Sequence, residues 1–209
     1  RVDLSESLSK AHGKLASFVA GPELSDWLAR PHQVEGFQTL PGVFSADGPD
    51  RGSVLLAGAL PAKLGGKVAD LGAGWGFLAV EILKRPGVKR LDLVEAEGDA
   101  LDCARVNITD PRTRFHWADA TTWRPETLLD VVVMNPPFHT GREADPALGA
   151  AFIRAARRML APSGELWLVA NRHLPYDAVL SESFLEVRDV AGDGGFRVIQ
   201  AIKPKRAKP

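Results

Sequence analysis

The chain has 209 residues, of which 45% are hydrophobic and 25% are charged, a balance that suits one globular domain with a real core. Its formal net charge is zero, which excludes a global electrostatic attraction to nucleic acid, so any such partner must meet local basic patches. The single cysteine, Cys103, excludes a disulfide framework and a multi-cysteine metal site, and we expect no metal. The sequence has no signal peptide and no apolar run long enough to cross a bilayer, which predicts a cytoplasmic protein without a membrane partner.

The first residues are the least regular part of the chain. The sequence begins at Arg1 without an initiator methionine, as expected of a fragment, and we interpret residues 1–32 as a linker or the remnant of a preceding domain. Apolar residues at a loose helical period predict a helix over Leu4–Val19, and a short helical turn is expected over Leu24–Leu28. Residues 33–209 then form the main domain.

The main domain opens with three local signals. Weak alternation over Gln33–Leu40 predicts a strand. The Pro41-Gly42 pair that follows is typical of a type II turn. Asp50 is a good N-cap for a helix over Gly52–Leu60.

From residue 68 onward, short apolar runs alternate with helical patterns. The expected strands are Val68–Leu71, Leu91–Val94, Thr113–Trp117, Leu129–Met134, Glu165–Ala170, Leu185–Val190 and Arg197–Ile202. The expected helices are Gly76–Lys84, Asp99–Val106, Pro146–Leu160 and Tyr176–Ser183. The glycine-rich turn at residues 192–195 joins the last two strands as a hairpin, so one of them runs antiparallel to the rest. We therefore expect an α/β protein with a Rossmann-like, seven-stranded, mostly parallel sheet, helices on both faces and one antiparallel strand.

The expected strand Leu129–Met134 ends abruptly in Asn135-Pro136-Pro137-Phe138. Its unbroken branched apolar run is typical of a strand buried on both faces. Proline cannot donate to a sheet ladder, and it holds the preceding residue extended, so the strand must stop at Asn135. The result is a rigid carboxamide, a fixed carbonyl at Pro136 and a ring at Phe138, at the sheet edge where open α/β proteins bind ligands.

A glycine loop follows the first strand of the alternating region. Gly72, Gly74 and Gly76 let the backbone approach a ligand closely, and an acid, Asp70, precedes them at the strand end. A second acid, Glu95, ends the next strand, where a carboxylate can accept hydrogen bonds from both hydroxyls of a ribose. The Gly-x-Gly-x-Gly spacing differs from the Gly-x-Gly-x-x-Gly of nicotinamide enzymes, the alternative class for such a loop.

Together these strand ends resemble those of class I S-adenosylmethionine-dependent methyltransferases, from roughly Phe37 to the C-terminus. The resemblance implies that the glycine loop approaches the amino-acid end of S-adenosyl-L-methionine. Its remaining implications are these: Asp70 orients the cofactor ammonium, Glu95 holds the ribose, Asp119 and Ala120 meet the adenine, and Asn135 contacts cofactor and substrate.

The Asn-Pro-Pro-Phe turn supplies acceptors for a planar nitrogen nucleophile. In an exocyclic amine or an amide the lone pair is delocalised, so the nitrogen attacks poorly. The Asn135 side-chain oxygen and the Pro136 carbonyl, aimed at its N–H bonds, would localise that lone pair and favour the developing positive charge. Phe138 can stack on a planar substrate. These three residues are the predicted catalytic set.

A more local resemblance narrows the substrate. The segments at residues 39–45, 135–139, 169–176 and 196–201 resemble the catalytic domain of bacterial small-subunit rRNA guanine-N2 methyltransferases, the RsmC type. This resemblance implies transfer of a methyl group to guanine N2 of 16S rRNA, in the small ribosomal subunit or its assembly intermediates. Enzymes for adenine N6 and for protein glutamine share the turn and remain alternatives, as does a non-catalytic cofactor-binding scaffold.

Two basic regions are candidates for contacting RNA phosphates. The first is the helix that carries Arg154, Arg157 and Arg158, although most arginines on an amphipathic helix simply face water. The second, which we favour, is the tail of Lys203, Lys205, Arg206 and Lys208, and Arg142 follows the catalytic turn directly.

Overall fold

The computed structural model describes residues 7–10, 13–137, 139–140, 143–144 and 146–206. Contacts divide the chain into two compact units, residues 1–30 and 31–209. The smaller unit contains the antiparallel pair β1 (Leu8–Lys10) and β2 (Gly13–Leu15) and the short 3₁₀ helix η1 (Pro22–Trp27). None of the described helices is long and apolar enough to cross a membrane.

The predicted helix over Leu4–Val19 is wrong, because residues 8–10 and 13–15 form the β1–β2 hairpin and residues 16–19 are irregular. Leu8 and Leu15 are cross-strand partners, and both side chains are largely exposed. A short helix gains most of its stability from packing an apolar face, and the two leucines that would form that face are 70% and 69% exposed. The helical turn expected near Leu24–Leu28 is confirmed by η1.

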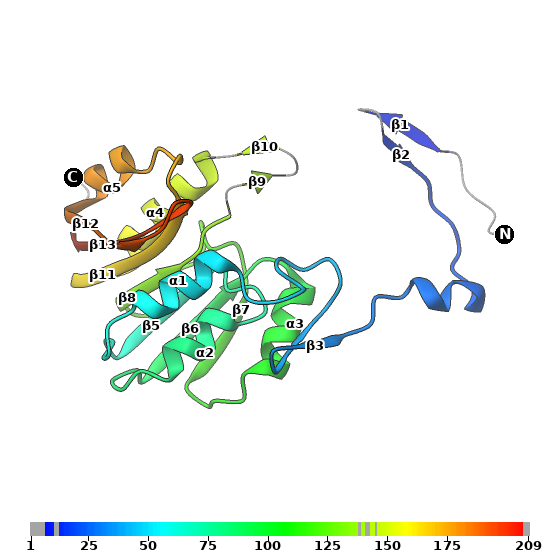
Figure 1. Cartoon of the computed structure of the whole chain (residues 1–209), viewed down its shortest axis with the longest axis horizontal. Coiled ribbons are helices and arrows are strands. Elements are labelled where there is room, and N and C mark those ends of the chain that lie inside the picture. The colour runs from blue at the N-terminus through cyan, green and yellow to red at the C-terminus, as the bar shows by residue number, and fades with distance from the viewer. Residues whose placement is uncertain (1–6, 11–12, 138, 141–142, 145, 207–209) are drawn as a thin grey trace. The chain divides into compact units, whose positions relative to one another are not determined.

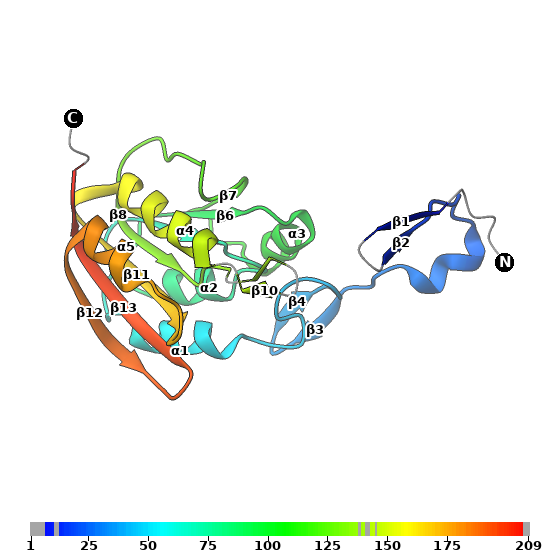
Figure 2. The same ribbon diagram turned by 90° about the horizontal axis from the view of Figure 1, so that it is seen from above.

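The larger unit is built on a seven-stranded sheet in the order β12-β13-β11-β8-β5-β6-β7 (Figures 1 and 2). Its strands are β5 (Lys67–Leu71), β6 (Arg90–Glu95), β7 (Thr113–Trp117), β8 (Leu129–Met134), β11 (Leu160–Asn171), β12 (Phe184–Gly192) and β13 (Phe196–Pro204). β13 runs antiparallel to both of its neighbours, and the pairs among β5, β6, β7, β8 and β11 are parallel. The predicted seven-stranded fold with one antiparallel strand is confirmed.

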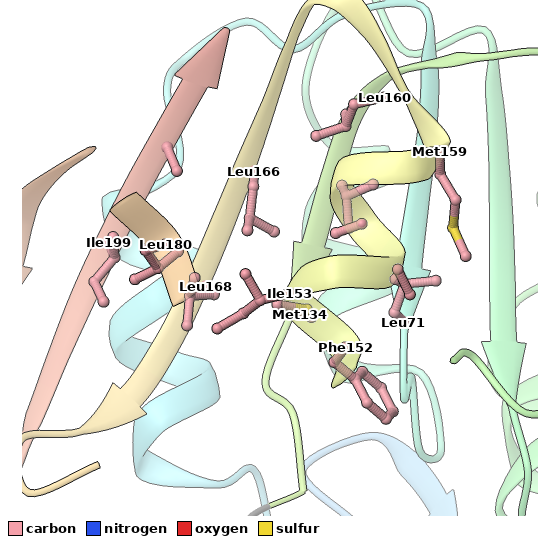
Figure 3. Close-up of a cluster of buried hydrophobic side chains, with 14 of the residues drawn as sticks. Leu71, Met134, Phe152, Ile153, Met159, Leu160, Leu166, Leu168, Leu180 and Ile199 are labelled. Carbon is pink, nitrogen blue, oxygen red and sulfur yellow. The ribbon is translucent and has the colours of Figure 1, made fainter. Parts of the chain in front are cut away.

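Helices cover both faces of the sheet, as the buried strand β8 requires. Val131 and Val133 pack toward a cluster that includes α1 (Arg51–Ala59), α2 (Phe77–Leu83) and α3 (Gly98–Asn107). Val132 and Met134 pack on the opposite face, toward α4 (Pro146–Met159) and α5 (Asp177–Ser183). Figure 3 shows this second cluster, in which Phe152, Ile153 and Met159 of α4 lie near Leu71, Met134 and Leu166 of the sheet.

The connections differ from the expectation in three places. The strand expected over Gln33–Leu40 is a hairpin of β3 (His32–Val34) and β4 (Phe37–Thr39), because Glu35 and Gly36 take positive φ angles of 49° and 85°. β9 (His139–Thr140) and β10 (Glu143–Ala144) were not expected. β11 starts directly after α4, with a register irregularity before Glu165.

The turn that follows the β3–β4 hairpin agrees with the prediction. Gly42 has φ 104°, and the Val43 amide donates to the Leu40 carbonyl at 3.3 Å, as in a type II turn. Val43 then packs in a third small cluster with Trp75, Ala100 and the buried Cys103.

Candidate functional site

The carboxyl ends of β5, β6, β7 and β8 meet at one edge of the sheet, around a cavity of about 440 Å³. Seven of the predicted site residues line this cavity. They are Gly72, Gly74, Glu95, Asp119, Ala120, Asn135 and Pro136. Asp70 and Gly76 do not line it, and Phe138 lies outside the described residues. The fold therefore brings most of the predicted site residues together around one cavity, although they follow four different strands.

The glycine loop depends on left-handed backbone conformations. Gly72, Gly74 and Gly76 have φ values of 70°, 56° and 96°, which side chains adopt only with strain. A Cβ atom on Gly74 would meet nothing within 4 Å, so the space beside this glycine is open, and Gly74 lines the cavity. A Cβ atom on Gly76 would lie 2.7 Å from Cδ1 of Ile108. Gly76 is therefore required by packing against Ile108 as well as by its φ angle, and not by contact with the cavity.

Glu95 joins the end of β6 to the glycine loop. One carboxylate oxygen accepts from the Gly74 amide at 2.7 Å, and the other accepts from the Ala96 and Glu97 amides, both at 2.8 Å. The pKa of neighbouring Glu97, which also lines the cavity, is raised by burial and then by the charges of Glu95 and Asp99. The side of the cavity formed by Glu95 and Glu97 is therefore acidic and suits hydroxyl or cationic groups of a ligand.

Asp70 is a fully buried carboxyl group at the end of β5. Among the described residues, neither of its oxygens has a hydrogen-bond partner of good geometry, although the Ala79 backbone lowers its pKa in part. Burial, followed by the charge of Glu95, raises the pKa of Asp70 to about 8. A buried acid without a partner is costly, so a cationic ligand group nearby would be favourable.

The side chain of Asn135 is held by the start of α1. Its Nδ2 donates to Oδ2 of Asp50 and to Oγ of Ser53, both at 2.9 Å. Asp50 is also the N-cap of α1, because the same Oδ2 accepts from the Ser53 amide at 2.9 Å. A second cavity of about 50 Å³ is lined by Asp50, Ser53 and Asn135, and it shares Gly72 and Gly74 with the larger one.

Sequence reasoning missed several residues that line the larger cavity. Leu148 and Phe152 come from α4, and Phe44 comes from the turn before α1. Phe44 is 58% exposed, yet its backbone is fixed, since Nε1 of Trp75 donates to the Phe44 and Ser45 carbonyls at 3.1 and 3.2 Å. The only signal for Phe44 was its place in the segment 39–45, which carried the family resemblance without indicating a role.

The sheet order, the inserted antiparallel strand and the ligand-sized cavity at the carboxyl edge define the fold of class I methyltransferases. The similarity to known methyltransferases extends beyond the site to most of the chain. The chain belongs to the methyltransferase small domain family, whose model matches residues 35–200.

Among curated proteins, the chain is similar to ribosomal RNA small subunit methyltransferase C of Shigella flexneri serotype 5b and of Escherichia coli O1:K1. Both are 36% identical over 180 residues, which is 85% of this chain and 52% of each relative. The chain thus spans about half the length of the curated relatives it matches.

Solved structures agree. The T. thermophilus 16S rRNA N2 G1207 methyltransferase (RsmC), in complex with AdoMet and guanosine, is 30% identical with a TM-score of 0.67. The match covers 84% of this chain and 50% of that one. M. jannaschii TYW2, at 16% identity and a TM-score of 0.59, covers 92% of this chain and shares the fold. The resemblance to class I methyltransferases, and within them to the RsmC type, is confirmed.

Proposed function

We propose that residues 33–209 form a catalytic domain that transfers a methyl group from S-adenosyl-L-methionine to guanine N2 of 16S rRNA. One observation carries the proposal: Asn135 lines the same cavity as the glycine loop and Glu95. A rigid acceptor for the nucleophile therefore lies beside the residues suited to hold the cofactor. The 36% identity to ribosomal RNA small subunit methyltransferase C supports the choice of substrate.

The residues present fit the cofactor. It supplies an electrophilic methyl sulfonium, so the protein need not activate the methyl group strongly. Glu95 would accept from the ribose hydroxyls, exchanging its hydrogen bond with the Gly74 amide for bonds to the ligand. Asp119 and Ala120 would border the adenine. Asp70 lies behind the glycine loop and holds a proton at neutral pH, and a nearby ammonium group would favour release of that proton and so an ionic contact.

The nucleophile is prepared by acceptors on the chain. The Asn135 oxygen and the Pro136 carbonyl would accept from the N–H bonds of the guanine amine, which raises electron density on the nitrogen as it attacks. These dipoles are fixed by Pro136 and Pro137 before the substrate arrives, and preorganised dipoles supply a large share of catalysis at such sites. The amine proton leaves to solvent after transfer, so we assign no strong base.

The substrate sets the cellular context. With an rRNA target, we expect the activity in the cytoplasm, on the small ribosomal subunit or its assembly intermediates. A base must leave its stack to reach the cavity, at a cost of a few kcal/mol, so exposed RNA should react best.

The test is to incubate the protein and labelled cofactor with separated ribosomal subunits and to map the methylated nucleoside. N2-methylguanosine in 16S rRNA supports the proposal. Labelled N6-methyladenosine or labelled protein glutamine would replace it with those alternatives. Cofactor binding without transfer to any acceptor would favour the scaffold.

Two variants connect that activity to the site. Asn135→Ala should lower kcat on the order of 100- to 1000-fold, since it removes a preorganised dipole, and cofactor binding should survive in calorimetry, with a change in Kd far smaller than that in kcat. Glu95→Ala should instead weaken cofactor binding, by roughly 1.5–3 kcal/mol for each lost hydrogen bond to a charged group. If Asn135→Ala raised only KM, Asn135 would be a binding residue and our mechanism would be wrong.

A further inference from the structure

Both hydrogens of the Asn135 side-chain amide are used by the start of α1. One bond goes to the Asp50 carboxylate and the other to the Ser53 hydroxyl, each at 2.9 Å, from residues 85 and 82 positions earlier in the chain. Among the described residues, the NH₂ end of the amide is thus the end held by α1. The oxygen lies at the other end, on a side chain that also lines the larger cavity.

Asp50 decides this orientation, and Ser53 supports it. A carboxylate only accepts hydrogen bonds, so it can face the NH₂ end of an amide but would repel the carbonyl oxygen. A hydroxyl both donates and accepts, so Ser53 alone could hold either end. Asp50 is itself fixed, because its Oδ2 caps α1 by accepting from the Ser53 amide. The capping acid therefore fixes the direction of an amide on a distant strand.

We infer that Asp50 and Ser53 are positioning residues, which turn the Asn135 oxygen toward the substrate and so restrict the site to a nitrogen that carries N–H bonds. This inference rests on the proposed function and adds to it the control of substrate chemistry. With the amide reversed, its NH₂ group would face the substrate amine, donor against donor. Such a site would neither localise the lone pair nor stabilise the developing charge.

The kinetic test uses Asp50→Asn, since asparagine caps helices about as well as aspartate. The variant should keep its melting temperature, while the new amide can face Asn135 with either end. We expect kcat to fall about 10- to 100-fold, the scale of a misplaced reacting group, with little change in KM or cofactor Kd. Ser53→Ala removes the second acceptor and should lower kcat less.

Asp47→Asn is the matched control. Asp47 lies three residues earlier in the same turn, is exposed, and makes no hydrogen bond to Asn135. The same change of charge there should leave kcat as in the wild type. An equal loss in both variants would mean that the charge of the turn matters and not the bond to Asn135, and the inference would be overturned.

A double-mutant cycle separates positioning from a direct role. If Asp50 acts through Asn135, adding Asp50→Asn to Asn135→Ala should cause no further loss of single-turnover rate. A further loss of the full size seen in the wild-type background would show that Asp50 acts without Asn135, which contradicts the inference.

Hydrogen exchange gives a readout that does not need activity. The side-chain NH₂ protons of Asn135, assigned by their loss in Asn135→Ala, should exchange about tenfold or more faster in Asp50→Asn. Asn107 is the internal reference, because its Nδ2 donates to the Gln38 and Trp75 carbonyls, both at 2.9 Å, and neither bond involves Asp50. Unchanged exchange at Asn135 would refute the positioning bond, whereas a wild type that methylates no RNA would refute the proposed function alone.

Discussion

The buried Asp70 carboxyl makes a specific prediction about pH and stability. Its ordinary pKa is 3.8, and burial raises the pKa to about 8 in the folded protein. Between these values the folded state holds a proton that the unfolded chain releases, so this group lowers stability as the pH rises from about 4 to about 8. Asp70→Asn removes the titration. At about pH 8 the variant should match or exceed the wild-type free energy of unfolding. At about pH 5 the free energy of unfolding of the variant, relative to that of the wild type, should be lower than at about pH 8.

Asp110 provides the control with the opposite sign. Hydrogen bonds from Arg112 lower the pKa of Asp110 to about 2. Its contribution is present above its ordinary pKa and is lost as the pH falls through about 2, so Asp110→Asn should cost the same at both values tested. Denaturant titrations of both variants give the comparison. Parallel pH profiles for wild type and Asp70→Asn would contradict the raised pKa.

The common location of the candidate site residues could be predicted where the local sequence is distinctive. Asn135 stands before two prolines at the end of an apolar run, and Glu95 and the glycines stand at strand ends, so their common edge followed from strand alternation alone. The bond between Asp50 and Asn135 could not be foreseen, because the sequence indicates only that Asp50 caps a helix. Nothing local says which strand that helix faces.

The packing of α4 against the start of α5 gives a prediction about two helices. Gly149 of α4 faces Tyr176, and a Cβ atom there would lie 1.8 Å from the tyrosine hydroxyl oxygen. Tyr176 is almost fully buried and precedes α5, so it has little room to move. Gly149→Ala should therefore destabilise the protein by about 1–3 kcal/mol, as overpacking usually does.

Gly58 of α1 is the matched control for Gly149. A Cβ atom on Gly58 would meet nothing within 4 Å, so Gly58→Ala brings only the better helix propensity of alanine. We expect Gly58→Ala to be neutral or to stabilise by up to about 1 kcal/mol. Denaturant melts of the two variants test this pair, and equal effects would mean that helix propensity, and not the Tyr176 contact, governs position 149.

Elements with a strong pattern were predicted better than those set by single turns. The central sheet strands were found because they combine an apolar run with a turn signal at the end, whereas the edge strands β7 and β12 were found from the regular alternation of strands and helices. The β3–β4 hairpin was merged into one strand, since its two arms have only three residues each and a Glu35-Gly36 turn between them. In the smaller unit, the spacing of Leu8 and Leu15 suggested a helix, but both side chains are largely exposed and so do not form the packed face that a helix needs.

The zero net charge of the chain conceals an uneven distribution of positive groups. The basic tail is partly engaged, because Lys203 pairs with Glu186 and the Lys205 ammonium donates to the Ser181 carbonyl. Lys208 and Arg142 lie outside the described residues. On α4, Arg154 lies 3.8 Å from Glu182. The contacts of Lys203 and Lys205 weaken our expectation that the tail is the better RNA candidate, and the contact of Arg154 leaves Arg157 and Arg158 as the candidates on α4.

Arg124, Arg157 and Arg158 form a cluster without a carboxylate partner among the described residues. Arg158 donates to the Thr121 carbonyl, and Arg124 donates to the next two carbonyls, so both guanidinium groups meet over the same turn. Burial, followed by the charges of Arg124 and Arg157, lowers the pKa of Arg158. The turn begins at Asp119, which lines the larger cavity, so this cluster lies near the proposed site.

If the chain binds rRNA as proposed, this arginine cluster should carry more of the salt dependence than the tail. Each phosphate contact to single-stranded RNA contributes about 0.7 to the slope of log K against log salt. Arg124→Gln combined with Arg157→Gln removes two such contacts. The magnitude of the slope of log K against log salt should therefore fall by about 1 to 2, while cofactor affinity stays unchanged. Arg158 is left intact because its bond to Thr121 joins α4 to the turn, whereas Arg124, among the described residues, bonds only the two residues before it in the chain. The matched control is Lys203→Gln with Lys205→Gln, which removes the same charge from groups already engaged and should change the slope less. Fluorescence anisotropy with a labelled rRNA fragment over a salt series measures both. A larger change of the slope in the lysine variant would contradict this prediction and assign the phosphate contacts to the tail.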